Sequence, residues 1–429
     1  MWNNENNKKS SLGLNMVEKI MSRHTNKIVK AGDIAICDID FAFGQDGTSG
    51  MIIDAFREME AKKVFDPKNC AMILDHSSPS PIIGVSAIHK KIREFTKEQG
   101  IILHDVGDGV CHQLVPEKGH VVPGDLIVGA DSHTCTYGAL NSCSTGMGST
   151  DVAGAMVAGK TWFKIPEIIK FVCNGKFPKG VYSKDLILYL IGQLTADGAT
   201  YKACEYVGEA IADLSIEARM TIANMAIEMG AKFGIMESDE KTSAWLKGKT
   251  DREFLAVESD DNANYSQIIE TDVTNLGPKI AMPHTVDNVC PIEDVLGKKM
   301  DQAVLGTCTN GRIEDFKVAA EVIKGHKVHP DVRFIIVPAS RSILLQAMEL
   351  GYIQTLVEAG AALVTPGCGP CVGTHNGVPS NGENVISTAN RNFKGRMGNG
   401  SAFIHLGSPA TVVASAIESK IADPRNYVN

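Results

Sequence analysis

Short apolar runs, each followed by a turn and then by a segment of helical period, recur along the whole chain. The turns are rich in Gly, Ser, Asp and Cys. Strands that alternate with helices in this way predict βαβ units and mostly parallel sheets. The predicted strands are Ile34–Ile39, Cys70–Leu74, Ile101–Leu103, Leu126–Gly129, Ala303–Leu305, Phe334–Val337, Ala362–Val364 and Val385–Thr388.

Three segments carry helix signals. Ser183–Leu194 begins with a residue suited to an N-cap. Ser408 and Pro409 precede the apolar stretch 410–417, and Ser at the N-cap with Pro at the first helical position favours a helix start. Ser80–Glu98 has an apolar stripe at helical spacing. That stripe consists of Ile82, Ile83, Val85, Ile88, Ile92 and Phe95.

We expect three α/β domains after a short extension. A chain of 429 residues has room for a few domains of roughly 150 residues each. Residues 1–13 are polar and predict a disordered N-terminal extension. The expected domains are 14–170, 171–285 and 286–429, and the third carries the cysteines discussed below. The acidic stretch 237–264 predicts surface loops.

Charge and composition argue against several functional classes. The chain has 42 Lys and Arg against 50 Asp and Glu, so its net charge is −8, which argues against a nucleic-acid partner. No apolar run approaches the roughly 20 residues of a membrane helix, so we expect no membrane association. The N-terminus lacks the apolar segment of a signal peptide. The 11 cysteines therefore predict free thiols in a cytoplasmic protein.

Unusual polar residues follow directly after several predicted strands. In open parallel sheets, ligand sites lie beyond the carboxyl ends of the strands, so these turns are expected to converge on one cleft. The turns are Asp75-His76, Asp131-Ser132-His133, Cys308, Cys368 and Asn390-Arg391.

Three cysteines are candidate metal ligands. Cys368 and Cys371 form a C-x-x-C motif after a buried strand, and Cys308 follows another strand. A single C-x-x-C suits a redox pair, half a zinc site or part of an iron–sulfur site. Three thiolates without an obvious fourth suit a cubane cluster with one open iron. The other cysteines are expected to be core residues; Cys135, beside Asp131, is ambiguous but favours a structural role.

Carboxylate–imidazole pairs and arginines supply the other candidate chemistry. Asp75-His76 and Asp131-Ser132-His133 suit acid–base work, although either pair alone is more typical of a hydrogen-bonded strand end. His112 is a third candidate. Asn390–Arg396 contains two arginines, whose guanidinium groups suit a substrate with two carboxylates. The alternative is that both arginines are solvated at the surface and bind no ligand. Two further sets are interpreted structurally: His24, His89, His326 and His329 as surface residues, and Gly146–Thr150 as a close-packing turn rather than an anion site.

Taken together, these segments resemble the aconitase superfamily, most closely the large subunit of its 3-isopropylmalate dehydratase branch. The motifs occur in the family's order and extend from about residue 14 through nearly the whole chain. They are Val128–Thr134, Thr221–Gly230, Gly306–Arg312, Pro366–Cys371 and Asn390–Arg396.

The resemblance implies an aconitase-like α/β fold of three domains around a central cluster cleft. It implies one [4Fe–4S] cluster on Cys308, Cys368 and Cys371. The residues at family catalytic positions are Asp75, His76, His112, Asp131, His133 and Glu228. Those at substrate or cluster positions are Gln45, Ser132, Asn224, Asn390, Arg391 and Arg396.

The resemblance also implies an incomplete enzyme. Single-chain aconitases continue into a swivelling fourth domain that supplies a serine base and a further Arg, and we expect a separate small subunit in its place. The implied reaction is reversible dehydration of a 2-hydroxy di- or tricarboxylate. The loop Phe43–Gly50 contains Gln-Asp where isopropylmalate enzymes commonly have His-Asp. Candidate substrates are therefore 3-isopropylmalate and 2,3-dimethylmalate, with 2-methylmalate (the citraconate hydratase reaction) and the homoaconitase or aconitase substrates as alternatives.

Three other functions remain open at this point. An RNA-binding or regulatory aconitase relative would need a basic patch, which the charge pattern lacks. An electron carrier would normally close its cluster with four cysteines. A zinc-structured interaction module would contain zinc and no sulfide.

Overall fold

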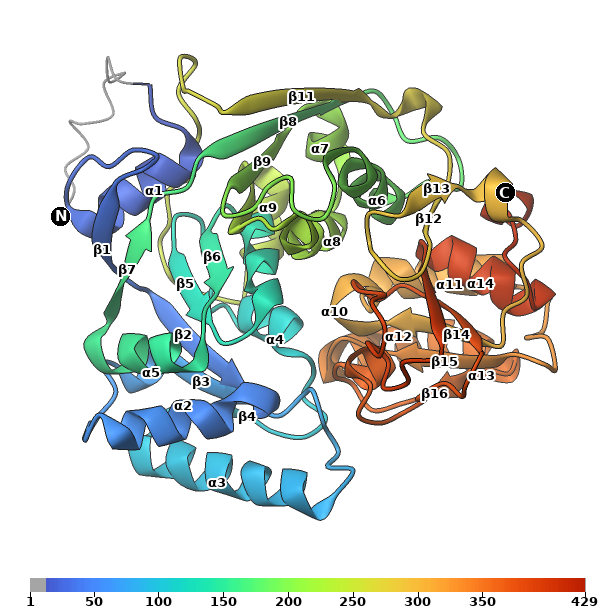
Figure 1. Ribbon diagram of the computed structural model, residues 1–429, viewed down its shortest axis with the longest axis horizontal. Coiled ribbons are helices and arrows are strands. Elements are labelled where there is room, and N and C mark those ends of the chain that lie inside the picture. Colours follow the sequence, from blue (N-terminus) through green and yellow to red (C-terminus); the bar gives the residue numbers. More distant parts are fainter. Residues whose placement is uncertain (1–12, 429) are drawn as a thin grey trace.

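The first lobe is built on a five-stranded sheet in which every strand is parallel to its neighbours. The computed structural model describes residues 13–428 and shows this lobe in blue and cyan (Figure 1). The helix α2 (Asp46–Glu58) packs between α3 (Ile83–Gln99) and α5 (Ser149–Ala158) along this lobe. In spatial order the strands are β4 (Ile102–His104), β3 (Cys70–Ile73), β2 (Phe41–Gln45), β5 (Leu126–Gly129) and β6 (Cys143–Gly146), and the helices are α1 (Met16–Thr25), α2 (Asp46–Glu58), α3 (Ile83–Gln99), α4 (Cys111–Glu117) and α5 (Ser149–Ala158).

The second lobe contains a four-stranded parallel sheet, drawn in green to olive (Figure 1). Its order is β10 (Phe233–Met236), β9 (Ala203–Val207), β8 (Ile168–Asn174) and β11 (Gln267–Asp272). The accompanying helices are α6 (Ser183–Leu194), α7 (Glu209–Asp213), α8 (Ile216–Met225) and α9 (Glu240–Leu246).

The third lobe, drawn from gold through orange to red, contains a seven-stranded sheet (Figure 1). Its order is β13 (Val289–Pro291), β12 (Lys279–Ala281), β18 (Phe403–Leu406), β17 (Asn384–Ser387), β14 (Gln302–Gly306), β15 (Arg333–Val337) and β16 (Ala362–Leu363). Only the pairings of β12 are antiparallel. The helices are α10 (Thr307–Asn310), α11 (Ile313–Ile323), α12 (Arg341–Glu349), α13 (Tyr352–Glu358) and α14 (Pro409–Glu418).

The predicted mixed α/β class with mainly parallel sheets is confirmed. Seven of the eight predicted strands lie in the large sheets within one or two residues of their expected bounds. The eighth, at Ile34–Ile39, is wrong as a sheet strand. There β1 (Ile34–Asp38) pairs antiparallel with β7 (Lys160–Lys164) in a separate ribbon, and Ile34 and Ile36 are exposed. The sheet strand that was missed is β2, directly after this ribbon.

The helix predictions hold for two segments and fail in part for the third. The bounds of α6 match the prediction, although its N-cap is Tyr182 rather than Ser183. Ser408 is the N-cap of α14 as expected, although its hydroxyl contacts the hydroxyl of Thr411 at 3.0 Å rather than a backbone N–H. The stripe of 80–98 is wrong at its start, because Ile82 and Ile83 are exposed and α3 buries its later turns.

Two predictions concern the chain ends and the domain limits. The predicted extension 1–13 lies outside the described residues except for Gly13, which packs closely against the backbone of Asn262. The domain boundaries near residues 170 and 286 remain predictions. Within residues 13–428, no helix is long and apolar enough to cross a membrane.

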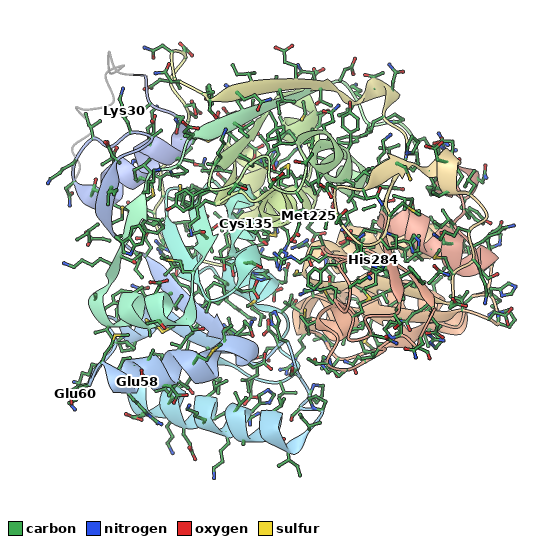
Figure 2. All side chains as sticks on the ribbon, in the orientation of Figure 1. Lys30, Glu58, Glu60, Cys135, Met225 and His284 are labelled. Carbon is green, nitrogen blue, oxygen red and sulfur yellow. The ribbon has the colours of Figure 1, made fainter. Side chains whose placement is uncertain are left out.

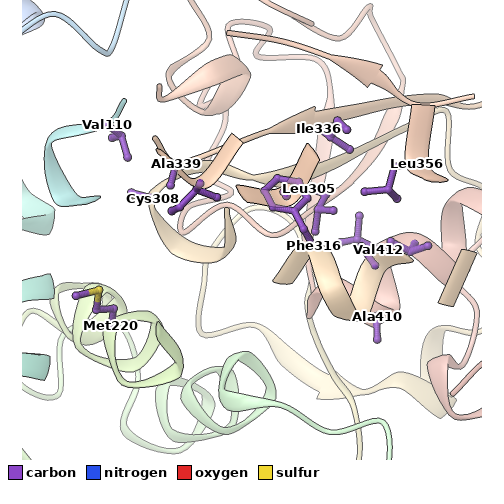
Figure 3. Close-up of a cluster of buried hydrophobic side chains, with 14 of the residues drawn as sticks. Val110, Met220, Leu305, Cys308, Phe316, Ile336, Ala339, Leu356, Ala410 and Val412 are labelled. Atoms are coloured by element: carbon purple, nitrogen blue, oxygen red, sulfur yellow. The ribbon is translucent and has the colours of Figure 1, made fainter. Parts of the chain in front are cut away.

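The lobes share a hydrophobic core where they meet. Figure 3 shows Val110 of the first lobe and Met220 of the second beside Cys308 and Ala339 of the third. The same cluster continues into the third lobe around Phe316. Interiors packed in this way transmit strain and resist deformation, so side chains at the junction are held on a rigid support.

Candidate active site

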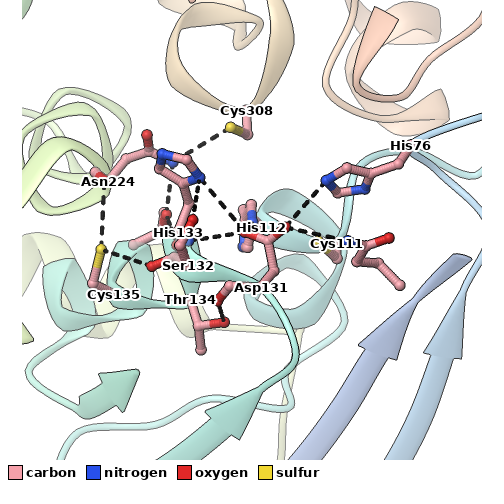
Figure 4. Close-up of polar contacts among 12 residues, drawn as sticks. His76, Cys111, His112, Asp131, Ser132, His133, Thr134, Cys135, Asn224 and Cys308 are labelled. Atoms are coloured by element: carbon pink, nitrogen blue, oxygen red, sulfur yellow. Dashed lines mark hydrogen bonds and ion pairs between the residues drawn. The ribbon is translucent and has the colours of Figure 1, made fainter. Parts of the chain in front are cut away.

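A network of imidazoles surrounds the carboxylate of Asp131, directly after β5 (Figure 4). Its Oδ1 lies 2.8 Å from Nε2 of His112, and its Oδ2 lies 3.2 Å from Nε2 of His76. The backbone N–H of His133 donates to Oδ1 at 2.8 Å. Asp131 is the N-cap of the 3₁₀ helix Ser132–Leu140, which explains why a carboxylate fits this position.

The network extends in both directions from Asp131. Oδ1 of Asp75 lies 2.8 Å from Nδ1 of His76, while its Oδ2 accepts the backbone N–H of Cys111 at 2.7 Å. On the other side, Nε2 of His133 lies 2.7 Å from Glu228. Glu228 also accepts Nε of Arg391 at 2.8 Å. All three lobes therefore contribute to one continuous network of acidic and basic groups, here called the acid–base chain. Its members are Asp75, His76, His112, Asp131, His133, Glu228 and Arg391.

The electrostatics assign different protonation states to the imidazoles. Burial alone would lower the pKa of His76, but the carboxylates of Asp75 and Asp131 outweigh burial and raise it well above its ordinary value. Burial lowers the pKa of His112 despite its bond to Asp131. Burial opposes ionisation of Asp131, yet its contacts with the imidazoles, His112 foremost, hold its pKa well below its usual range. At neutral pH, His76 is a cation and His112 is neutral.

The three candidate cysteines lie beside this network and are buried. Cys308 is in α10 at the end of β14, and Cys368 and Cys371 follow β16. The side chain of Asn390 contacts two of the sulfurs: its Nδ2 lies 3.4 Å from Cys308, and its Oδ1 lies 3.6 Å from Cys371. The backbone N–H of Cys368 donates to the Asp75 carbonyl at 3.0 Å, which ties the cysteines to the acid–base chain.

Nitrogen donors face the cysteine sulfurs. Nδ2 of Asn224 lies 3.4 Å from Cys308 Sγ, and Nη2 of Arg396 lies 3.3 Å from Cys371 Sγ. A hydrogen bond from the Cys368 thiol, together with the Arg396 guanidinium, holds the pKa of Cys371 well below its ordinary value. Burial raises the pKa of Cys308 to about 11. Three close cysteines with N–H groups directed at sulfur fit an iron–sulfur cluster, because such hydrogen bonds stabilise and tune cluster sulfur.

The remaining predicted residues lie around the same site. Nε2 of Gln45, at the end of β2, donates to Asp131 at 3.4 Å. Ser132 is half-buried, with its hydroxyl 3.4 Å from Nδ1 of His133. Asp131 and Ser132 also line a cavity of about 610 Å³ that reaches Trp162 and Lys232. The predicted site residues thus lie in one region of the molecule.

Two buried cations near the cysteines were not found by sequence reasoning. The guanidinium of Arg312 donates to the carbonyls of Cys308 at 2.7 Å and Thr309 at 2.8 Å, and so holds the cysteine turn. Nζ of Lys184 donates to the carbonyls of Thr388 at 2.7 Å and Ala389 at 2.8 Å. Arg312 follows Cys308 by four residues, so its position in the sequence could have indicated a role near the cysteines. Nothing in the sequence around Lys184 indicated that it lies there.

Some expected surface or structural residues can now be placed. The expectation that His24 and His89 lie at the surface is wrong, because both are largely buried against carboxylates, at 2.7 Å from Asp40 and 3.0 Å from Asp46. Cys135 lies where the first two lobes meet (Figure 2), with its thiol 3.4 Å from the carbonyl of Asn224. The turn at Gly146 packs tightly, since a Cβ there would lie 2.4 Å from the Asp131 carbonyl.

Comparison with known proteins gives a consistent result over nearly the whole chain. The chain is 50% identical to the 3-isopropylmalate dehydratase large subunit 1 of Thermotoga maritima, covering 97% of this chain and 100% of that one. It is 48% identical to the subunit of the same name from Methanopyrus kandleri, with the same coverage. It is also 50% identical to a probable methanogen homoaconitase large subunit of Methanosarcina mazei, over 91% of this chain and 99% of that one.

A family profile identifies the chain more broadly. The profile of the aconitase family (aconitate hydratase) matches residues 18–419. That span includes every residue of the network around Asp131 and all three cysteines. Members of this family are iron–sulfur enzymes, in agreement with the donors that surround the sulfurs. The chain therefore belongs to the aconitase family.

Proposed function

We propose that the chain is the large, catalytic subunit of a hydro-lyase that reversibly dehydrates a 2-hydroxy dicarboxylate of the substituted-malate type. The observation that carries this proposal is the acid–base chain around Asp131, which lies directly against three buried cysteines. Dehydration needs a group that assists departure of hydroxide, a proton donor for it and a base for the C–H proton.

We assign Cys308, Cys368 and Cys371 as ligands of one [4Fe–4S] cluster. When bound, such a cluster supplies a Lewis-acidic iron that polarises the substrate hydroxyl. Asn224 and Arg396 donate hydrogen bonds to the cysteine sulfurs. Those bonds stabilise negative charge on sulfur in a buried site, where charge is otherwise costly.

His76 is assigned as the proton donor to the departing hydroxide. It is a cation at neutral pH because Asp75 and Asp131 raise its pKa. Those carboxylates also fix the plane of the ring through both nitrogens. His112 stays neutral and anchors Asp131 from the other side. The C–H proton passes to a base that we assign to a separate small subunit.

Arg391 and Arg396 are assigned to the substrate carboxylates. Arg391 is partly exposed, and Glu228 holds it through Nε. The bonds to Glu228 use Nε alone, so we assign the other guanidinium nitrogens to a bidentate contact with a substrate carboxylate. We assign Gln45, Ser132, Asn224 and Asn390 to the same binding region. Glu228, which also contacts His133, is assigned to orient Arg391.

The partner is inferred from the relatives. They are named large subunits, and this chain covers them over almost their full length. A separate small subunit would therefore complete the site. Free buried thiols and an iron–sulfur site suit a reducing compartment, so we place the enzyme in the cytoplasm.

The substrate is assigned by class. We propose 3-isopropylmalate or 2,3-dimethylmalate, because the relatives named for 3-isopropylmalate are similar to this chain from end to end. A second candidate is a homoaconitase substrate, favoured by the 50% identity to the Methanosarcina mazei chain. The two classes differ by one carboxylate.

A substrate screen tests the proposal. The chain is purified anaerobically with its small subunit, and formation of the unsaturated acid is followed for 3-isopropylmalate, 2,3-dimethylmalate, 2-methylmalate and the homoaconitase substrates. We expect activity with a substituted malate and its loss in His76→Gln. We expect its retention in the control His329→Gln, which changes a histidine outside the site whose Nδ1 accepts the backbone N–H of Asp331 at 3.2 Å. Turnover by the large chain alone would contradict the two-subunit assignment.

A further inference from the structure

The carboxylate of Asp46 is buried under the loop that carries Asp75 and His76. Asp46 is the first residue of α2, directly after Gln45, and only 3% of it is exposed. Its Oδ1 accepts the backbone N–H of Asp75 at 3.3 Å and of His76 at 2.7 Å. Its Oδ2 accepts the backbone N–H of Ser77 at 2.9 Å. One side chain therefore binds three successive backbone amides.

A fourth bond fixes the carboxylate itself. Nε2 of His89, which is buried on α3, lies 3.0 Å from Oδ2 of Asp46. Burial opposes ionisation of Asp46, but the bond to His89, the charge of His76 and the loop amides together outweigh burial and lower its pKa to about 2. The first turn of a helix also favours a negative charge. Asp46 is thus ionised whenever the protein is folded near neutral pH.

The loop needs this support because it leaves the sheet at the end of β3. Buried backbone N–H groups almost always have a partner, and here the sheet ladder no longer supplies one. From the opposite side, the loop is held by the Cys368 N–H on the Asp75 carbonyl and by a 3.3 Å contact between the hydroxyls of Ser77 and Thr374. Among the described contacts to this loop, those from Asp46 come from an ionised carboxylate.

We propose that Asp46, oriented by His89, is a positioning residue that fixes the loop 75–77 so that His76 faces Asp131. This inference rests on the proposed function for its kinetic consequence and on the hydrogen bonds alone for its structural one. Asp46 does not reach the reacting atoms; it acts through the backbone of Asp75 and His76. A misplacement of about 1 Å in a catalytic group can reduce a rate by about 100-fold.

The variant Asp46→Asn tests the inference with almost no change in volume. An amide keeps one acceptor oxygen, but its NH₂ group faces N–H donors, so the amides of the loop lose acceptors. Asp54→Asn is the matched control. It makes the same chemical change on the same helix, at a largely exposed side chain that is bonded to Lys91 at 2.6 Å.

Two measurements on the complete two-subunit enzyme are compared. In Asp46→Asn we expect kcat to fall by about 10- to 100-fold with KM changed much less. We also expect the alkaline limb of the kcat profile to move to lower pH, because His76 loses the nearby charge of Asp46 and its fixed place between Asp75 and Asp131. His89→Phe should move both quantities in the same direction by less, and it serves if Asp46→Asn does not fold. Asp54→Asn should match the wild type.

Hydrogen exchange separates this inference from the proposed function. Backbone amides of 75–77 should exchange at least about 10-fold faster in Asp46→Asn than in Asp54→Asn, whether or not the substrate has been identified. Unchanged exchange would overturn the inference. If the amides of 75–77 exchange faster in Asp46→Asn but kcat and its pH profile match the wild type, the inference is also overturned, because a less stable loop would then not affect catalysis. Failure of the wild type to turn over any hydroxy acid would instead count against the proposed function.

Discussion

Lys184 offers a quantitative test of the charge balance around the cysteines. Its side chain is completely buried, with two backbone carbonyls as its hydrogen-bond acceptors. Burial lowers its pKa to about 7 from the ordinary 10.5, although the nearby Cys308 and Cys371 favour the charged form. Between about pH 7 and 10.5, the unfolded chain therefore holds a proton that the folded chain has lost. In this interval, stability must rise with pH.

The magnitude follows from the interval. Within this range, each increase of one pH unit adds about 1.4 kcal/mol to the free energy of unfolding. Over the full range, the free energy of unfolding therefore rises by about 5 kcal/mol. Lys184→Met removes this dependence. Between about pH 7 and 9.5, the wild type should gain about 3 kcal/mol relative to the variant.

Urea unfolding of cluster-free protein at a series of pH values measures this difference directly. All other titrating groups are shared and cancel in the comparison. The control is Lys241→Met, since Lys241 also donates to a backbone carbonyl, Ala212 at 2.6 Å, but from an exposed position. Parallel pH profiles for wild type and Lys184→Met would refute the reasoning.

Three further predictions concern packing, the cysteine turn and acid stability. Gly138→Ala should abolish soluble folding, because the added Cβ would lie 1.8 Å from the carbonyl oxygen of Gly234. The control Gly154→Ala has open space around the added Cβ and should raise the melting temperature slightly, because Ala favours a helix more than Gly does. Arg312→Met should destabilise the chain by about 3 kcal/mol in urea unfolding, because two buried carbonyls lose their donor; a loss below about 1 kcal/mol would contradict this. Burial lowers the pKa of His120 to about 4, so stability should rise between about pH 4 and 6.5, and His120→Gln should flatten this rise by about 3 kcal/mol in melting experiments.

The site was predictable from the sequence where its residues are set by local structure. Asp131 and Cys308 follow the carboxyl ends of buried parallel strands, where ligand sites of such sheets lie, so these residues could be identified from the sequence. Because the carboxyl ends of neighbouring parallel strands lie at the same edge of a sheet, the topology predicts that the residues after these strands lie close together. The resemblance then extended the set to Glu228 and Asn224, which no strand pattern indicated.

The residues that escaped prediction depend on distant partners. His89 lies among charged residues in the sequence, which suggests an exposed position. Its buried partner is the carboxylate of Asp46, 43 residues away in the sequence. Lys184 is held by carbonyls more than 200 residues away. Likewise, the apolar run at Ile34–Ile39 has the composition of a buried strand, yet nothing in the described chain covers Ile34 or Ile36. Local patterns do not report which surface a segment will meet.

We propose that Cys308, Cys368 and Cys371 of this chain hold an iron–sulfur cluster that serves a hydro-lyase. Anaerobic iron and sulfide analysis of the wild type, Cys371→Ala and the control Cys204→Ala tests it most directly. Cys204 is a buried core cysteine on β9, in the second lobe. We predict about four irons and four sulfides per chain in the wild type and in Cys204→Ala, and their loss in Cys371→Ala. A wild type that holds no iron after anaerobic reconstitution, or a Cys371→Ala variant that keeps the full complement, would contradict the account.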